Sequence, residues 1–364
     1  MLSLLLASAW IQDQAASRVF YVGDPEKATT RLAIFIRDEK MSTPKSSPKK
    51  FGDPPAPLMF EWVVGGLARR SGANKEPFEA RFRVFSQERK AENDKAPKVV
   101  RMLLRLWENN AIRFSLEHAK VYNNGTVDVY LCWGGDPGGE QLFDEDVDPT
   151  GVKKVNTIYI YDLNSFKNPV EMAREIAHEY GHATLPAVGG FKEPEDWGNG
   201  YLGEKMYMRY LRDEMKAKRI EPIDVMDATL EQLDAWVKLH VDPLVQRTAD
   251  EGPQFGLLEG TGAAAMDAYI GVNLLLDQIF PPRVYAAMLR DTGSTQAKDF
   301  AEGVIRTVEN YGTGIVLELT PNLRKQLWVP VGRGSVRGAD VLKKSRGWWL
   351  IKPGIGAVTI LPPK

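Results

Sequence analysis

Two histidines and one glutamate have the spacing of a zinc site in the segment His178-Glu179-Tyr180-Gly181-His182. On an α-helix, residues i and i+4 lie on one face about one turn apart, so His178 and His182 can present imidazole nitrogens to a single Zn²⁺. Zinc lowers the pKa of a bound water to near neutrality, and the carboxylate of Glu179 can take its proton and pass it to a leaving amine. The segment therefore predicts zinc-assisted hydrolysis with Glu179 as the general base.

A helix must position these residues, and the flanking sequence has the signals that begin and end one. Asn168 is a typical N-cap, Pro169 suits the first helical position, and Glu171 stands at the third. Pro186 should end the helix, because a proline ring does not fit into a helix interior. We expect one helix through the whole motif. The alternative is a surface helix whose two histidines are only solvated.

The segments before this helix predict a small sheet. Alternating apolar residues predict a strand near Phe78–Val84, and a helical apolar face follows over Lys98–Asn109. Asn124-Gly125 is a hairpin-turn signal. Gly134–Val152 is rich in Gly, Asp and Pro and predicts an exposed acidic loop, whose spacing matches no EF-hand calcium loop. Further short strands are expected at Ile112–Leu116, Val127–Trp133 and Thr157–Asp162.

This order of elements resembles that of the zincin metallopeptidases, in which a small twisted sheet precedes the helix with the zinc histidines. The resemblance covers about Pro77 to His240 and implies an α+β catalytic domain with Zn²⁺ as its cofactor. In that superfamily the strand just before the helix often forms the upper edge of the cleft and pairs with extended substrate. Thr157–Asp162 is therefore expected to be a free edge strand.

A catalytic zinc site needs a third protein ligand and an open position for water. Leu185 and Val188 stand where the metzincin pattern has glycine and histidine, so that subclass is excluded. His118 and His240 lie far from the motif in the sequence, which favours a carboxylate as the third ligand. The candidate carboxylates are Glu193, Glu195, Asp196 and Glu204.

Glu204 is the preferred candidate, because the chain resembles the gluzincin branch of the zincins. That branch supplies a glutamate from a second helix about twenty residues past the second histidine. Glu204 lies 22 residues past His182, near the start of a predicted helix over Leu202–Lys218. It shares a helical stripe with three apolar residues, Met208, Leu211 and Met215, and a carboxylate at the head of a buried stripe needs a partner. The alternative is a first-turn glutamate favoured by the helix dipole.

Zincin chemistry also needs a donor that stabilises the developing oxyanion, usually a tyrosine or a histidine. The candidates are Tyr201, Tyr207 and His240, and each of them is equally consistent with packing or with a surface position.

The charge balance, the lengths of the apolar segments and the cysteine content exclude several classes of protein. The 364 residues include 47 basic and 48 acidic side chains, so no global field directs the protein to nucleic acid or to an anionic membrane. No segment is long and apolar enough to span a membrane. The single cysteine, Cys132, cannot form an intramolecular disulfide and lies in an apolar run typical of a buried side chain.

The chain is expected to have four parts. Residues 1–17 are a short apolar run with an Ala-Ser-Ala end, which predicts a signal peptide and a secreted or periplasmic protein. A β-rich region over 18–76 should precede a zincin-like catalytic domain over 77–310, in which further helices are expected at Leu230–His240, Gly262–Ile279 and Arg283–Leu289. A small β-rich module over 311–364 should follow.

The leading hypothesis is an exported zinc metallopeptidase that acts on a peptide or protein substrate. Two alternatives remain: a catalytically degenerate zincin that serves as an exported binding or cell-surface protein, and a structural zinc site closed by four protein ligands. The intact Glu179 argues against degeneracy, because a binding protein needs no general base.

Overall fold

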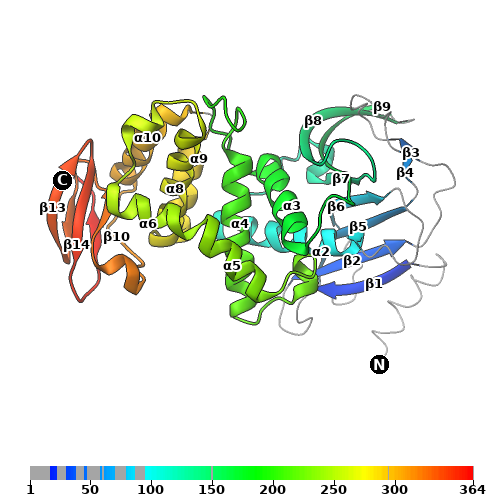
Figure 1. Ribbon diagram of the computed structural model, residues 1–364, viewed down its shortest axis with the longest axis horizontal. Coiled ribbons are helices and arrows are strands. Elements are labelled where there is room, and N and C mark those ends of the chain that lie inside the picture. The colour runs from blue at the N-terminus through cyan, green and yellow to red at the C-terminus, as the bar shows by residue number, and fades with distance from the viewer. Residues whose placement is uncertain are drawn as a thin grey trace. The chain divides into compact units, whose positions relative to one another are not determined.

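The protein contains both helices and β-sheets, which confirms the α+β class (Figure 1). A computed structural model describes residues 17–22, 30–37, 45–46, 58–59, 61–69, 79–86, 95–148, 151–293 and 295–363. The expected signal peptide lies almost wholly outside these residues. Among the described helices, none has the length and apolar composition needed to cross a bilayer.

The chain forms two compact units. The first comprises the described residues up to 108, together with 117–183 and 213–230; the second comprises 109–116, 184–212 and the described residues from 231 onward. The domain boundaries expected after residues 17, 76 and 310 stay predictions.

A seven-stranded mixed sheet forms the base of the first unit, with the strand order β1-β2-β5-β6-β7-β9-β8. The strands β6, β7 and β9 run parallel to one another, and all other neighbours are antiparallel. A separate two-stranded ladder joins β3 (Lys45–Ser46) and β4 (Leu58–Met59). The sheet strands are β1 (Ser17–Val22), β2 (Thr30–Arg37), β5 (Glu61–Arg69), β6 (Glu79–Ser86), β7 (Val127–Leu131), β8 (Gly138–Asp148) and β9 (Gly151–Tyr161).

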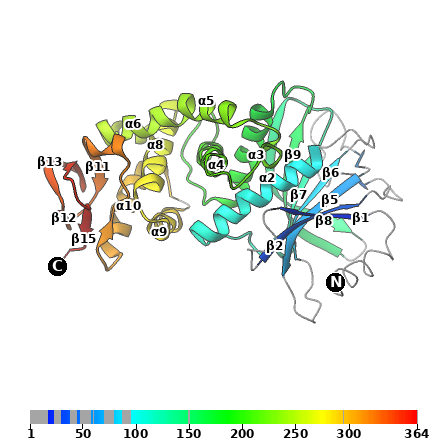
Figure 2. The ribbon, with the colours of Figure 1, turned by 90° about the horizontal axis from the view of Figure 1, so that it is seen from below.

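Two long helices of the first unit lie beside this sheet, α2 (Lys95–Asn109) and α3 (Pro169–Thr184) (Figure 2). The apolar face predicted for the first of them is fully buried, at Val99, Met102, Leu103 and Leu106. A short 3₁₀ segment, Pro222–Val225, also belongs to this unit. The predicted helix–sheet pairing is therefore present around the motif.

The prediction that Thr157–Asp162 is a free edge strand is wrong. Strand β9 pairs with β7 on one side and with β8 along its whole length on the other, so β8 forms the edge of the described sheet. The acidic loop predicted for Gly134–Val152 is correspondingly wrong over Gly138–Asp148. Glycine and acidic residues are depleted in strands, so local composition concealed a strand that its partner β9 stabilises.

Two further local predictions are wrong. Ile112–Leu116 is not a strand, because the chain continues from α2 through a π-helical turn at Asn110–Phe114. Asn124 and Gly125 do adopt the left-handed turn conformation, within a short 3₁₀ segment at Asn123–Gly125. They form no hairpin, because the following strand β7 pairs in parallel with β6.

The second unit is mainly helical. Its helices are α4 (Asn199–Lys216), α5 (Leu230–His240), α6 (Asp242–Glu251), α7 (Phe255–Leu258), α8 (Ala263–Ile279), α9 (Pro282–Thr292) and α10 (Ala297–Asn310). Two of them, α4 and α5, begin or end in the first unit. The expected helices at 202–218, 230–240, 262–279 and 283–289 are present with small shifts of their ends, whereas α6, α7 and α10 were not predicted.

Two three-stranded sheets end the chain, in the orders β10-β15-β12 and β11-β14-β13, and we call them the C-terminal β module. The module is attached to the helices partly through Trp348, a fully buried residue whose indole N–H donates to the Ala301 carbonyl (3.3 Å). Besides a 3₁₀ turn at Pro321–Arg324, it contains β10 (Ile315–Val316), β11 (Leu327–Pro330), β12 (Ser335–Arg337), β13 (Ala339–Ser345), β14 (Trp348–Pro353) and β15 (Thr359–Leu361).

Candidate metal centre

The helix α3 holds the motif and has the predicted ends. The Glu171 N–H donates to the Asn168 side-chain oxygen (3.0 Å), and the Lys167 N–H donates to the Glu171 carboxylate (2.9 Å). These bonds satisfy backbone donors that have no partner within the first turn. The helix ends at Thr184, two residues before Pro186.

A buried histidine anchors the middle of α3 to the rest of the first unit. The Nδ1 of His118 lies 2.9 Å from the Gly125 carbonyl oxygen, and its Nε2 lies 2.9 Å from the Tyr180 hydroxyl. Because a carbonyl only accepts, Nδ1 donates to it and Nε2 accepts from Tyr180. Burial lowers the pKa of His118 to about 4, so the ring is neutral at pH 7. His118 thus orients the motif helix through Tyr180.

A second anchor holds the C-terminal end of α3. The Asn156 side chain on β9 donates to the Ala183 carbonyl (3.0 Å) and accepts from the Gln141 side chain on β8 (2.8 Å). The Ala183 carbonyl belongs to the last helical turn, where carbonyls have no partner within the helix. Sequence reasoning missed Asn156; its only signal is a polar residue inside the apolar run of β9.

Two histidines and one glutamate are brought together by α3 and the loop that follows it. The rings of His178 and His182 have their centroids 5.0 Å apart. One ligand atom each from His178, His182 and Glu195 lies within 4.8 Å of the other two, and all three residues are partly buried. Two imidazoles and one carboxylate are the protein ligands of many catalytic zinc sites, in which a fourth position stays open. The donor set therefore fits a metal ion.

The carboxylate in this group is Glu195, whereas the sequence favoured Glu204. Glu204 is buried on α4, and the apolar stripe predicted for that helix is buried as well, at Met208, Leu211 and Met215. The Lys205 ammonium lies 3.5 Å from the Glu204 carboxylate. The other two candidates, Glu193 and Asp196, are exposed. Glu204 as a metal ligand stays a prediction, and Glu195, another of the candidates from the sequence, is the carboxylate that lies together with the histidines.

The loop that contains Glu195 has a defined conformation. Its two ends are joined by a bond from the Gly198 N–H to the Val188 carbonyl (2.9 Å) and by one from the Asn199 side chain to the Leu185 carbonyl (3.2 Å). A side chain at Gly198 would collide with the Tyr269 ring, so the loop packs closely against α8. Further bonds run from the N–H groups of Gly189 and Lys192 to the carbonyls of Thr295 and Thr261. The Glu195 carboxylate is therefore presented by a fixed backbone.

Glu179 is almost fully buried, at 3% exposure, and lies against the start of β8. A Cβ atom added to Gly139 would stand 2.6 Å from Glu179 Cγ and 2.7 Å from its Oε1. Such distances are shorter than any van der Waals contact, so only glycine lets the edge strand approach the carboxylate this closely. Gly139 thereby fixes the space that the carboxylate of Glu179 can occupy.

We expect Gly139→Ala to lower kcat roughly tenfold to a hundredfold, because displacing a reacting group by about 1 Å has costs of this size. Zinc affinity should change little, since the three atoms nearest to the added carbon all belong to Glu179. The measurements are steady-state kinetics and zinc titration. The matched control is Gly256→Ala, where no atom lies within 4 Å of the added carbon. Unchanged kcat in Gly139→Ala would show that the carboxylate tolerates the displacement.

Among the candidates for the oxyanion donor, Tyr207 has a structural role. Its hydroxyl is fully buried and bonded to the Asn110 side chain (2.8 Å) and to the Thr184 hydroxyl (3.1 Å). Tyr201 is partly buried with the Lys205 ammonium above its ring, and His240 is exposed at the end of α5. Sequence reasoning missed a further tyrosine, Tyr161, in which burial, reinforced by Cys132 and by the carboxylates of Glu140 and Glu179, raises the hydroxyl pKa.

Tyr161 ends β9, and because burial raises its pKa it keeps its proton at all ordinary pH values and can donate a hydrogen bond. The single cysteine, Cys132, is buried and free, and burial raises the pKa of its thiol to about 12. The expectation of a buried cysteine is confirmed.

The buried neutral His118 makes stability depend on pH. Its pKa is about 4 in the folded protein and 6.5 when unperturbed, so between these values the unfolded chain binds a proton that the folded one does not. Stability should be unaffected above pH 6.5 and should fall by up to about 3 kcal/mol as the pH drops toward 4. Denaturant unfolding of His118→Gln should lack this component, whereas the exposed-site control His240→Gln should retain it. Identical pH profiles for wild type and His118→Gln would contradict the assignment.

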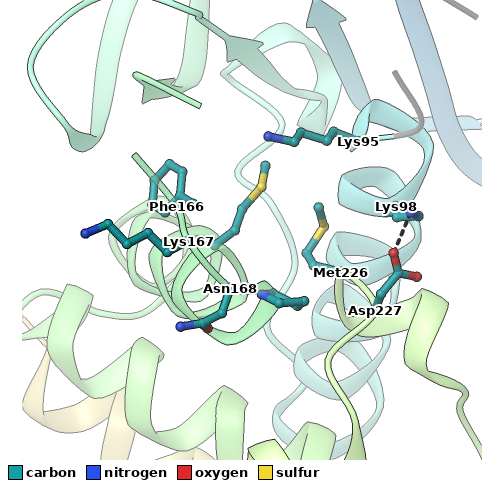
Figure 3. A pocket seen from close by; sticks show the side chains of 9 residues that line it. Lys95, Lys98, Phe166, Lys167, Asn168, Met226 and Asp227 are labelled. Carbon is teal, nitrogen blue, oxygen red and sulfur yellow. Dashed lines mark hydrogen bonds and ion pairs between the residues drawn. The ribbon is translucent and has the colours of Figure 1, made fainter. Parts of the chain in front are cut away.

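A separate hollow lies at the other end of α3 (Figure 3). Its volume is about 210 Å³, and Lys98 at its wall forms an ion pair with Asp227 (2.5 Å). Asn168 and Pro169, at the start of the helix, also line it. His178 stands nine residues further along the helix, so this hollow is not the cleft of the candidate metal centre.

No protein-family model and no curated protein matches the sequence. The assignment of the centre therefore depends on its residues and their geometry.

Proposed function

We propose that this protein is a zinc-dependent metallopeptidase. The observation that supports this most strongly is the grouping of His178, His182 and Glu195 beside a buried Glu179 on a capped, doubly anchored helix. A structural zinc site would need a fourth protein ligand, whereas the group among the described residues contains three. Three ligands and an adjacent carboxylate favour hydrolysis.

His178 and His182, with Glu195 or Glu204, would hold the ion. A bound Zn²⁺ would supply Lewis-acid chemistry, which polarises a carbonyl oxygen and makes water acidic near neutral pH. The Glu179 carboxylate accepts the proton of the attacking water and returns it to the leaving amine. The Tyr161 hydroxyl, whose pKa is raised by burial, stays protonated and would donate a hydrogen bond to developing negative charge.

The edge strand β8 offers a way to hold an extended polypeptide. It is the last strand of the described sheet, and its Gly139 backbone lies against Glu179. A peptide that paired with its free edge would run past the general base, because main-chain hydrogen bonds position strands without regard to side-chain type. The proposed substrate is therefore an unfolded or extended segment of a peptide or protein.

Export to the periplasm or the cell exterior is part of the proposal. It is supported only by the apolar N-terminal run and its Ala-Ser-Ala end. Comparing the mass of the protein from a cell extract with that from the periplasm or medium would test it, because cleavage after this run shortens the exported form.

Metal removal tests the proposed activity. We expect about one zinc per chain by elemental analysis and hydrolysis of an unfolded, fluorescently labelled protein. Dialysis against a zinc chelator should abolish this hydrolysis, and stoichiometric Zn²⁺ should restore it. A zinc-loaded protein that cleaves neither unfolded protein nor mixed peptides would contradict the peptidase proposal and favour a binding role.

A further inference from the structure

The charges of the chain are distributed unevenly. Residues 315–364 contain nine Lys or Arg residues and two acidic residues, Glu318 and Asp340. The remaining 314 residues contain 38 basic and 46 acidic side chains. The near-neutral total therefore conceals a strongly cationic C-terminal β module, which can create its own local field.

Eight of these nine basic residues belong to the described part of the chain, and all eight are exposed. Arg333 and Arg346 form ion pairs with the helices of the second unit, at 3.0 Å and 3.2 Å. Four others form no ion pair with any residue that the structure describes: Arg337, Lys343, Lys344 and Lys352. Their charges are available to a partner.

These four cations belong to the edge strand β13, to its neighbour β14 and to the end of β12; the strands β13 and β14 lie side by side in Figure 1. Lys343 and Lys344 belong to β13, which ends the β11-β14-β13 sheet and has one free edge among the described strands. Lys352 belongs to the neighbouring β14, where it stands in register with Asp340 of β13. Arg337 ends β12, two residues before β13 begins. The cationic edge is thus a local feature of the module.

Large aliphatic side chains are exposed on the same edge. Val341 and Leu342 on β13 are 40% and 51% exposed, and Ile355 is fully exposed. The turn that contains Ile355 lies beside the start of β13, because the Gly354 N–H donates to the Gly338 carbonyl (2.9 Å). Exposed aliphatic side chains next to lysines are typical of surfaces that enter the interfacial region of an anionic bilayer.

The aromatic residues of the module argue against single-stranded nucleic acid as the partner. Single-stranded nucleic acid is held largely by bases that stack on exposed aromatic rings. The three tryptophans are buried: Trp328, Trp348 and Trp349 are exposed by 8% or less. From the cationic edge, the exposed aliphatic residues and the covered rings, we propose that the C-terminal β module binds the surface of an anionic lipid bilayer through β13 and the 354–356 turn.

Vesicle binding by the full-length protein tests this. Phosphatidylcholine vesicles with about 30% phosphatidylglycerol should sediment the protein at low salt, whereas pure phosphatidylcholine vesicles should not. Raising the salt to about 0.5 M should release much of it, because exposed charges are then screened. Failure to bind the anionic vesicles at low salt would overturn the proposal.

Two variants separate the contribution of charge to vesicle binding from that of the apolar side chain. Lys343→Gln combined with Lys344→Gln should weaken vesicle binding about 30-fold, and Ile355→Ser about tenfold. The control Lys120→Gln with Lys298→Gln removes two exposed lysines elsewhere and should bind like wild type. Because the Lys344 ammonium lies over the Trp349 ring, thermal unfolding of the first variant must match wild type. If the thermal unfolding of this variant differs from that of the wild type, the double variant Arg337→Gln with Lys352→Gln is used in its place.

The same variants distinguish a lipid partner from a nucleic-acid partner. If the protein bound DNA or RNA at least as tightly as vesicles, and Ile355→Ser altered neither affinity, the surface would be a general polyanion site and the lipid proposal would be wrong. Loss of vesicle binding in Ile355→Ser with nucleic-acid affinity unchanged would support it.

Discussion

Glu179→Gln should retain zinc at wild-type stoichiometry and lose at least two orders of magnitude in kcat. The amide has nearly the shape of the carboxylate but cannot accept the proton of the attacking water, and general-base catalysis contributes about 10²–10⁴-fold. The substitution leaves His178, His182 and Glu195 in position, so the metal site should survive. Elemental analysis and steady-state kinetics on the same preparation measure both quantities.

A matched control exists on the same helix. Glu171→Gln makes the identical chemical change at the first turn of α3, where glutamine can still accept the Lys167 N–H. Its kcat and its zinc content should equal those of the wild type. If Glu179→Gln were as active as Glu171→Gln, Glu179 would not be the base; if it lost its zinc, the two roles could not be separated by this change.

Glu195→Gln should weaken zinc binding by more than a hundredfold, whereas Glu204→Gln should weaken it less. Removing a residue that only hydrogen-bonds to a zinc ligand already lowers zinc affinity about 10–100-fold, and removing a direct ligand lowers it more. The expectation follows from the grouping of Glu195 with both histidines. Competition with a chromogenic zinc chelator measures all affinities on one scale.

Glu193→Gln is the control, since this exposed residue lies two positions before Glu195 on the same loop. It should bind zinc like the wild type. The opposite order, with Glu204→Gln as the severe variant, would return the third ligand to α4 and support the gluzincin-like assignment. Thermal unfolding of each apo variant shows whether any loss reflects the fold instead of the site, which matters for the buried Glu204.

The sequence predicted the motif helix well because its signals are local. Asn168, Pro169 and Glu171 determine one end and Pro186 the other, and all act within a few residues of the helix. The buried stripe of α4 was predictable for the same reason, since its period of 3.6 residues is a property of that segment alone.

The strand β8 and the loop of Glu195 were not predictable from local signals. The glycine and acidic residues of β8 are unfavourable for a strand, and only the eleven-residue ladder with β9 makes one. Three carboxylates lie within four residues at Glu193, Glu195 and Asp196, and loop conformation decides which one approaches the histidines. Two of the hydrogen bonds that hold this loop are accepted by Thr261 and Thr295, which lie far from it in the sequence.

The β8–β9 ladder also limits how long a paired peptide can be. The outer half of the ladder joins residues 144–148 of β8 to residues 151–155 of β9 and lies beyond the end of β7, which pairs with β9 only from Asn156 onward. In this outer half, Glu145 of β8 stands opposite Lys154 of β9. Charged edge residues discourage the addition of another strand. In the proposed peptidase, pairing with a substrate would thus be confined to the inner half, from Gly138 to about Phe143, or roughly 20 Å of extended chain. Substrates much shorter than about six residues should therefore be cut slowly, whatever their sequence.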